Sequence, residues 1–476
     1  MRVSDQNELE LPPLDGLLAR LGEYVAIPSD SRNADPGTMR RAAEWIAREL
    51  DFANGRVEDT GGHPVVRGEW LGAPGAPTVL VYGHYDVQPT GDEAEWTSPP
   101  FDLTLDRHPT EGAIVRGRGA SDDKGPVLLV VAMLQAAIAQ RGRLPLNVKF
   151  LIEGEEEIGS PQLPGYVCEH APELACDLVI SADGAQWRPD EPSLSVASKG
   201  LVAFTVTVEG ARDDLHSGRY GGTVANPAHV LATILASLHG ADGSVAVPGF
   251  YDGVTAPSAQ RLAELAAVPF DDERFAAQLG VPETYGEAGY STLQRLWERP
   301  TLEVNGVTGG GRYTVIPHVA RGFVSCRLVG DQDPERVLAA VRAHVARLAP
   351  RGVRVAVEQD GGAVPAYRID PAHPAIGAAA DALRSVYPGQ DVLLAVIAGT
   401  LPATTLFERE LGAKTLFFSF STADEKLHAP NEFLRVRRIH EGMRAWDALL
   451  ISMADGPRRL APASLPAPPQ ATGVEA

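Results

Sequence analysis

The sequence predicts an α/β protein in which a mostly parallel sheet is interrupted by an inserted ferredoxin-like (α+β) domain. Three observations support this fold class. Short apolar runs alternate with helical patterns in the first part of the chain, as βα units do. A similar apolar run returns near the end, at 414–421. The stretch between them has the order β-α-β-β-α-β, which is typical of ferredoxin-like domains.

The strands of the parallel sheet are predicted from runs that are apolar throughout, as in strands buried on both faces. These are TVLVYG (78–83), LNVKFLI (146–152), DLVIS (177–181) and the later KTLFFSFS (414–421). PVLLVVAMLQAAIAQ (126–140) is apolar nearly all round and predicts a buried helix. In open parallel sheets, ligands bind beyond the carboxyl ends of the strands. Polar residues directly after these runs are therefore candidates for a site.

The middle of the chain alternates apolar and polar residues, which predicts a small antiparallel sheet with one face free of helices. A stretch of mixed short elements, 240–300, interrupts its pattern. The predicted strands are 201–210, 301–307, 321–329 and 353–359, and the predicted helices are 226–239 and 333–348.

These elements divide the chain into domains. We expect one domain to be formed by 1–197 and 370–455, with 198–369 inserted into it. The Pro/Ala-rich segment 456–476 has no periodicity and is expected to be disordered.

Bulk properties exclude several classes of protein. At 476 residues the chain is too long for one ordinary core. Its net charge of −20 argues against a nucleic-acid surface, which needs a clustered basic face. No run approaches the roughly 18 apolar residues of a membrane span, and the acidic N-terminus does not resemble a signal peptide. Three cysteines without a CxxC pair indicate a reduced, cytoplasmic location.

Five polar residues stand in short motifs around the predicted strand ends. Asp122 precedes the buried helix, and the other four follow strands. Two imidazoles and three carboxylates can hold two divalent metals if one carboxylate bridges them. The motifs are GHYDVQP with His84, GRGASDDKG with Asp122, EGEEEIGS with Glu157, SADG with Asp183 and HAPNE with His428.

Each of these residues also has a simpler interpretation. His84 would be a core histidine, Asp122 or its neighbour Asp123 a helix cap, Glu157 part of an acidic loop, Asp183 a turn residue and His428 a surface histidine. Their joint placement at one edge of one sheet favours the metal site.

Neighbouring side chains can complete the chemistry of such a site. Glu156 can take the proton of a water that bridges the metals. Asp86 can accept the second ring N–H of His84 and fix its tautomer. In the middle domain, His216 lies in the glycine-rich DLHSGRYGG and can donate to the oxyanion of an attacked amide. Arg327 can pair with a substrate carboxylate. The simpler interpretations, a surface histidine for His216 and an ordinary salt bridge for Arg327, explain these two residues almost as well.

These motifs together resemble the M20 metallopeptidases, in particular the branch of carnosinases and Cys-Gly dipeptidases. The resemblance covers about residues 20–455. It implies a di-zinc or di-manganese catalytic domain with an inserted lid domain that dimerises. We expect zinc, although mixed His/carboxylate sites also accept Mn or Co.

The resemblance also assigns roles to individual residues. His84 and Asp183 would hold one metal, Glu157 and His428 the other, and Asp122 would bridge them. Glu156 would be the general base and Asp86 would orient His84. The peptide bond from Asp122 to Asp123 would be cis, and His216 would reach into the active site of the partner subunit.

Two positions bear on the substrate. Family members with aspartate at the position of Asp183 act on dipeptides with a free amino terminus, whereas those with glutamate are carboxypeptidases or deacylases. Relatives also carry an R-E-G-G-S-I-P-like segment at the substrate's C-terminal end. This chain reads VIAGTLP there, with Thr400 in the serine position, so carnosine-like selectivity is not implied.

We therefore expect a cytoplasmic, homodimeric metallo-dipeptidase that uses a metal-bridging water activated by Glu156. The partners expected are a small peptide and a second copy of the chain, with no nucleic acid or membrane. One alternative is an N-acyl amino acid amidohydrolase of the same fold, and a second is a non-catalytic binding protein.

Overall fold

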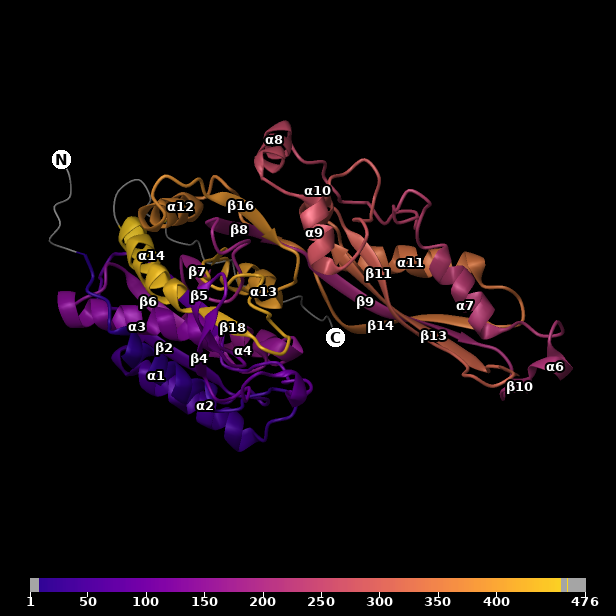
Figure 1. Cartoon of the computed structure of the whole chain (residues 1–476), viewed down its shortest axis with the longest axis horizontal. Coiled ribbons are helices and arrows are strands. Elements are labelled where there is room, and N and C mark those ends of the chain that lie inside the picture. The colour runs from indigo at the N-terminus through magenta and orange to yellow at the C-terminus, as the bar shows by residue number, and fades with distance from the viewer. Residues whose placement is uncertain (1–7, 455–459, 461–476) are drawn as a thin grey trace, which may run out of the picture. The chain divides into compact units, whose positions relative to one another are not determined.

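The computed structural model describes residues 8–454 and Leu460, and the predicted tail 456–476 lies outside them except for Leu460. The chain divides into two compact units (Figure 1). Among the described residues, the first contains 8–196, 369–395, 402–454 and Leu460, and the second contains 197–368 and 396–401. The predicted boundaries near 197 and 369 lie beside these limits, but the short segment 396–401 groups with the second unit.

A six-stranded sheet forms the centre of the first unit, in the order β1-β2-β6-β3-β7-β17. Neighbours from β6 to β17 run parallel, while β1 and β2 are antiparallel additions at one edge. The mostly parallel sheet is thus confirmed. Its strands are β1 (Arg56–Glu58), β2 (Val65–Trp70), β3 (Thr78–His84), β6 (Asn147–Glu153), β7 (Leu178–Ser181) and β17 (Thr415–Phe417).

The last of these strands is shorter than the predicted 414–421. Phe418 still donates its backbone N–H to Ser181 at 3.0 Å, and the chain then leaves the sheet. Ser421 donates its hydroxyl to the carbonyl of Ser121 at 2.6 Å. Serine side chains that bond to backbone groups in this way compete with strand pairing, so the apolar run continues as a buried loop.

Helices cover both faces of this sheet, as its apolar strands require. Apolar side chains of α4, α5 and α13 pack on one face, around Leu80, Leu151 and Val179. The predicted buried helix is α3, which contacts β3, α1 and α14. The helices of this unit are α1 (Leu14–Val25), α2 (Pro36–Glu49), α3 (Lys124–Arg141), α4 (Leu163–Glu169), α5 (Ala171–Leu174), α12 (Pro374–Val386), α13 (Pro402–Leu411) and α14 (Val436–Ala454).

Gly83 shows how closely α3 approaches the end of β3. A Cβ atom at this position would lie 2.5 Å from both Asp123 Oδ2 and Val127 Cγ2. Only glycine leaves room for this approach. The close packing places the start of α3, and the polar residues before it, beside the last residue of β3.

The second unit contains a four-stranded antiparallel sheet in the order β11-β13-β9-β14. Helix α7 contacts β9 and β13, and α11 contacts β9 and β14 (Figure 1). The chain order β9-α7-β11-β13-α11-β14 confirms the predicted ferredoxin-like arrangement. The elements are β9 (Gly200–Glu209), α7 (Pro227–Ala236), β11 (Thr301–Thr308), β13 (Val319–Leu328), α11 (Pro334–Leu348) and β14 (Arg354–Val364).

The remaining elements are short. The interrupting stretch between α7 and β11 contains three helices, and the sheet β15-β8-β16 contains the residues where one unit passes into the other. No helix within the described ranges is long and apolar enough to cross a membrane. These elements are β4 (Thr104–His108), β5 (Gly112–Arg116), β8 (Ser193–Ser198), β10 (Leu215–His216), α6 (Ser217–Tyr220), α8 (Ala259–Ala267), α9 (Asp272–Leu279), α10 (Thr292–Glu298), β12 (Val315–Ile316), β15 (Tyr367–Arg368), β16 (Leu393–Ile397), β18 (Phe433–Arg435) and the 3-10 turns η1 (Asp51–Ala53), η2 (Glu93–Glu95) and η3 (Glu156–Ile158).

Candidate metal centre

All five predicted metal ligands belong to the first unit, and four of them stand at or after the ends of strands in its central sheet. His84 is the last residue of β3, and Asp183 follows β7. Glu157 lies in η3, directly beyond β6, and Asp122 lies in the turn before α3. His428 is in the loop after β17, with a left-handed backbone (φ 61°). Strand order brings the other four positions to one edge of the sheet, and the close approach of α3 to the end of β3 adds Asp122.

Asp122 joins the two predicted histidines. Its Oδ1 is 3.1 Å from Nε2 of His84, and its Oδ2 is 2.9 Å from Nε2 of His428. Each carboxylate oxygen therefore faces a different imidazole, as a bridging ligand requires. The peptide bond from Asp122 to Asp123 is cis. The alternative role in helix capping is wrong, because the cap residue of α3 is Asp123 and its side chain makes no capping hydrogen bond.

The ligand atoms fall into two groups. His84, Glu156 and Asp183 offer atoms within 4.8 Å of one another, and so do Asp122, Glu157 and His428. In the second group, Nε2 of His428 is 3.3 Å from Oε2 of Glu157. Together the two ligand groups contain six residues, which are His84, Glu156, Asp183, Asp122, Glu157 and His428.

The three consecutive acids after β6 point in different directions. Glu155 is buried and accepts backbone N–H groups from His63 at 3.0 Å and Gln162 at 3.3 Å. Glu156 and Glu157 instead join one ligand group each. Glu155 therefore holds the surrounding loops, and its neighbours are left for the site.

Asp86 supports the site through more contacts than the sequence predicted. The ring Nδ1 of His84 lies 3.0 Å from the backbone carbonyl of Asp86 and 3.4 Å from its Oδ1. Because a carbonyl can only accept, Nδ1 carries a proton, which leaves Nε2 as the ring nitrogen that can bind a metal. The Asp86 carboxylate also accepts the backbone N–H of Glu156 at 3.2 Å and of Glu157 at 3.1 Å. One side chain thus positions three members of the site.

Burial makes the carboxylates reluctant to carry charge. It raises the pKa of Glu157 to about 8 and that of Asp183 to about 6. Burial and the nearby Asp183 raise the pKa of Glu156 well above its usual range. In the absence of cations, the site therefore binds protons in their place.

The imidazoles and Asp122 stabilise each other as ion pairs. The hydrogen bond to Asp122 raises the pKa of His428 to about 9. Burial opposes the charge on Asp122, but the hydrogen bonds to His428 and His84 hold its pKa below the usual range.

The residues present fit two divalent cations. Four carboxylates meet two imidazoles in the two ligand groups. Buried carboxylates are stable when they are paired or coordinate metals. Oxygen and imidazole ligands suit Zn, Mn and Co. The chemistry of the donor set therefore accounts for acids that the protein alone leaves poorly compensated.

The second unit carries the remaining predicted residues. His216 is exposed, at the end of β10, and its Nδ1 accepts the backbone N–H of Gly218 at 3.1 Å. A backbone N–H can only donate, so the neutral ring has its proton on Nε2. The exposed side of the ring is therefore a hydrogen-bond donor.

Arg327 and Thr400 contact each other in this unit. Nη1 of Arg327 donates to Oγ1 of Thr400 at 2.8 Å, and Thr400 donates to the carbonyl of Lys199 at 2.6 Å. Burial lowers the pKa of Arg327, and burial together with Arg327 lowers that of Lys199 to about 8. The alternative of an ordinary salt bridge is wrong, because Arg327 has no carboxylate within ion-pair distance among the described residues.

Sequence reasoning missed three supporting side chains in the first unit. Gln88 donates to Oε2 of Glu157 at 2.8 Å. Glu425 and Glu432 precede and follow His428 in the sequence. Both are buried and contact the Asp122 loop. Gln88 and Glu432 lie inside GHYDVQP and HAPNE, so the motifs themselves contained the signal.

Comparisons with known proteins agree with this site. The sequence model of peptidase family M20/M25/M40 matches residues 80–452. Cys-Gly metallodipeptidase DUG1 of Saccharomyces cerevisiae is 30% identical over 406 residues, covering 83% of each chain. These findings confirm the resemblance inferred from the motifs.

Two solved structures have the same fold over nearly their whole length. Human carnosine dipeptidase 1 is 28% identical, with a TM-score of 0.78, and the match covers 93% of this chain and 96% of that one. The M20 family metallo-carboxypeptidase Sso-CP2 from Sulfolobus solfataricus is also 28% identical, with a TM-score of 0.81 and coverage of 92% and 99%.

Proposed function

The chain belongs to peptidase family M20/M25/M40, and on that premise we propose that it is a metal-dependent dipeptidase acting on dipeptides with a free amino terminus. One observation carries the proposal. Two ligand groups, each made of two carboxylates and one imidazole, are joined through the two oxygens of Asp122. The names of the relatives point in the same direction, since the yeast and human proteins are dipeptidases.

We assign His84 and Asp183 to one cation, Glu157 and His428 to the other, and Asp122 to both. Zinc is the metal we expect, with Mn or Co as substitutes. When bound, two such cations polarise the scissile carbonyl and lower the pKa of water.

Glu156 is assigned as the general base because it lies in a ligand group whose cation is already assigned to other residues, His84, Asp183 and Asp122. Its side chain is half-buried, whereas that of Glu157 is buried, so substrate reaches Glu156 more easily. Its raised pKa suits a group that must hold a proton during turnover. Glu156 takes the proton of the attacking water as the C–O bond forms. It returns that proton to the leaving amine as the C–N bond breaks.

Residues of the second unit would bind the substrate. Arg327 offers a half-buried cation, with no carboxylate partner among the described residues, for the terminal carboxylate, and Thr400 holds its guanidinium. His216 presents Nε2–H and would stabilise the oxyanion. We assign this histidine to the active site of the partner subunit, so the enzyme would work as a homodimer.

The three cysteines are free, and from this absence of disulfide bonds among them we propose a cytoplasmic location.

Substrate class is tested by comparing hydrolysis of a dipeptide library, a tripeptide and N-acetyl amino acids, with Zn and with Mn separately. The proposal expects turnover of free dipeptides and little turnover of N-acetyl amino acids. Preference for the N-acetyl compounds would establish the deacylase alternative instead. Preference for removing the last residue of longer peptides would point to carboxypeptidase activity.

The shared active site is tested with mixed dimers. His216→Ala and Glu156→Gln variants should each be nearly inactive, and after subunit exchange part of the activity should return. In a hybrid dimer, one active site has both an intact base and an intact histidine. No recovery after confirmed exchange would mean that His216 does not act across the dimer.

A further inference from the structure

Glu432 is a fully buried carboxylate that holds the loop leading to Asp122. Its Oε1 accepts the backbone N–H of Ser121 at 2.9 Å and of Asp122 at 3.1 Å. Its Oε2 accepts the N–H of Gly119 at 3.0 Å and Nη1 of Arg118 at 2.8 Å. All four donors come from one short segment, 118–122, and converge on a side chain from a distant part of the chain.

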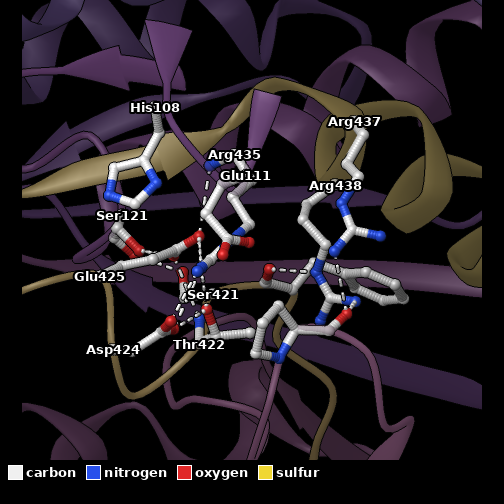
Figure 2. Close-up of polar contacts among 12 residues, drawn as sticks. His108, Glu111, Ser121, Ser421, Thr422, Asp424, Glu425, Arg435, Arg437 and Arg438 are labelled. Carbon is white, nitrogen blue, oxygen red and sulfur yellow. Dashed lines mark hydrogen bonds and ion pairs between the residues drawn. The ribbon is translucent and has the colours of Figure 1, made fainter. Parts of the chain in front are cut away.

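Glu425 makes a second connection between the same two loops. It is fully buried, and its Oε2 accepts the hydroxyl of Ser121 at 2.5 Å and the N–H of Thr422 at 3.1 Å. Its Oε1 accepts the backbone N–H of Arg435 at 3.2 Å and Nη1 of the same residue at 3.0 Å. Figure 2 shows Glu425 between Ser121 and Arg435.

Arg435 anchors this connection from the opposite side. Its guanidinium is fully buried and also contacts Asp424 and Glu111, with Nε 2.8 Å from Oε2 of Glu111 (Figure 2). Glu111 belongs to the turn between β4 and β5. The loop that begins at Thr422 is therefore held to the turn between β4 and β5 as well as to the Asp122 loop.

His428 lies between these two glutamates in the sequence, and Asp122 ends the segment that they hold. The two ligands come from loops 306 positions apart, yet their side chains meet at 2.9 Å. Neither loop can move relative to the other without breaking hydrogen bonds to a buried carboxylate, which is costly. The separation of Asp122 from His428 is therefore set by the protein before any cation binds.

We infer that Glu432, with Glu425, is a positioning residue that sets the affinity for the cation held by Asp122, Glu157 and His428. The inference rests on the proposed metal site. Groups that orient metal ligands in this way typically change metal affinity by about 10–100-fold when they are replaced.

The test compares Glu432→Gln with wild type by titrating the metal-free full-length chain with Zn²⁺ against a chromophoric chelator. The glutamine keeps the shape but turns one oxygen into an NH2 group, which cannot accept from the N–H groups it faces. We expect the binding event at Asp122, Glu157 and His428 to weaken about 10–100-fold, and the other event, which shares only Asp122 with it, to weaken less. Glu58→Gln is the matched control, because Glu58 accepts from Arg56 and Arg67 and contacts no ligand.

Thermal unfolding of the metal-free proteins separates positioning from a purely structural role. A structural role would lower Tm and leave both Zn²⁺ affinities unchanged, as expected for Glu58→Gln. If Glu432→Gln does not fold, Ser121→Ala removes only the hydroxyl contact with Glu425 and should weaken the same event several-fold.

Wild-type affinity for both cations in Glu432→Gln, or in Ser121→Ala if it is the variant used, would overturn the inference. Equal weakening of both events would do so too. A wild-type chain that binds no second cation would overturn the inference together with the proposed metal site. A chain that binds two cations but hydrolyses no dipeptide would contradict only the proposed activity.

Discussion

Replacing Glu156 by glutamine should abolish turnover while leaving the metal ligands in place. General base catalysis typically contributes about 10²–10⁴-fold to a rate, which corresponds to roughly 3–5 kcal/mol of activation free energy. Glutamine has the same size but cannot take a proton. Since His84, Asp183 and Asp122 remain, we expect kcat for a dipeptide to fall by that factor with two cations still bound.

The same substitution should stabilise the metal-free protein. Burial and the nearby Asp183 raise the pKa of Glu156, so ionising this side chain costs more free energy in the folded chain than in the unfolded chain. A neutral glutamine removes this penalty. Glu155→Gln is the matched control at the adjacent position. It weakens hydrogen bonds from His63 and Gln162, so it should cost about 1.5–3 kcal/mol of stability and keep most of the activity.

Steady-state kinetics, metal analysis and denaturant unfolding of both variants together test this reasoning. Near-wild-type kcat in Glu156→Gln would refute its role as the base. Loss of activity in Glu155→Gln without loss of stability would show that the two neighbouring acids have been assigned the wrong way round.

Further predictions concern stability and substrate binding. In the metal-free protein, burial raises the pKa of Glu157 to about 8, and an ion pair raises that of His428 to about 9. Both groups bind protons more tightly when folded, so Tm should fall as pH rises from about 5 to 9; a rising Tm would contradict this. Gly83→Ala would place Cβ 2.5 Å from two side-chain atoms and should lower the free energy of unfolding, measured with denaturant, by about 1–3 kcal/mol. Gly16→Ala is the control, because its Cβ would meet open space, and it should not lower that free energy. Arg327→Ala should raise KM for dipeptides about 10–100-fold but leave hydrolysis of a dipeptide amide unchanged; equal losses on both would exclude carboxylate binding.

The sequence was most informative where physical pattern and position coincide. Fully apolar runs identified β3, β6 and β7, because a strand buried on both faces tolerates no polar alternation. Once the strands are parallel, the residues that follow them meet at one edge. This is why His84 and Asp183, far apart in the chain, could be grouped before their distances were known.

Other parts of the site depend on contacts that spacing does not encode. Glu155, Glu156 and Glu157 have similar surroundings in the sequence. Backbone N–H groups of His63, in a distant loop, and of Gln162, in a nearby one, bind the Glu155 carboxylate away from the site. Glu432 follows His428 as an ordinary loop acid would, and its donors lie more than three hundred positions earlier. The end of β17 was overestimated because serine hydroxyls replace strand pairing after Phe417.

The central claim is that two cations, joined through Asp122, are required for dipeptide hydrolysis. The most direct measurement titrates the metal-free chain with Zn²⁺ and follows binding and hydrolysis of a free dipeptide in the same samples. The account predicts two cations bound per chain, with activity appearing as the sites fill and absent in Asp122→Asn. Full activity in the metal-free chain, or full activity with wild-type binding in Asp122→Asn, would contradict it.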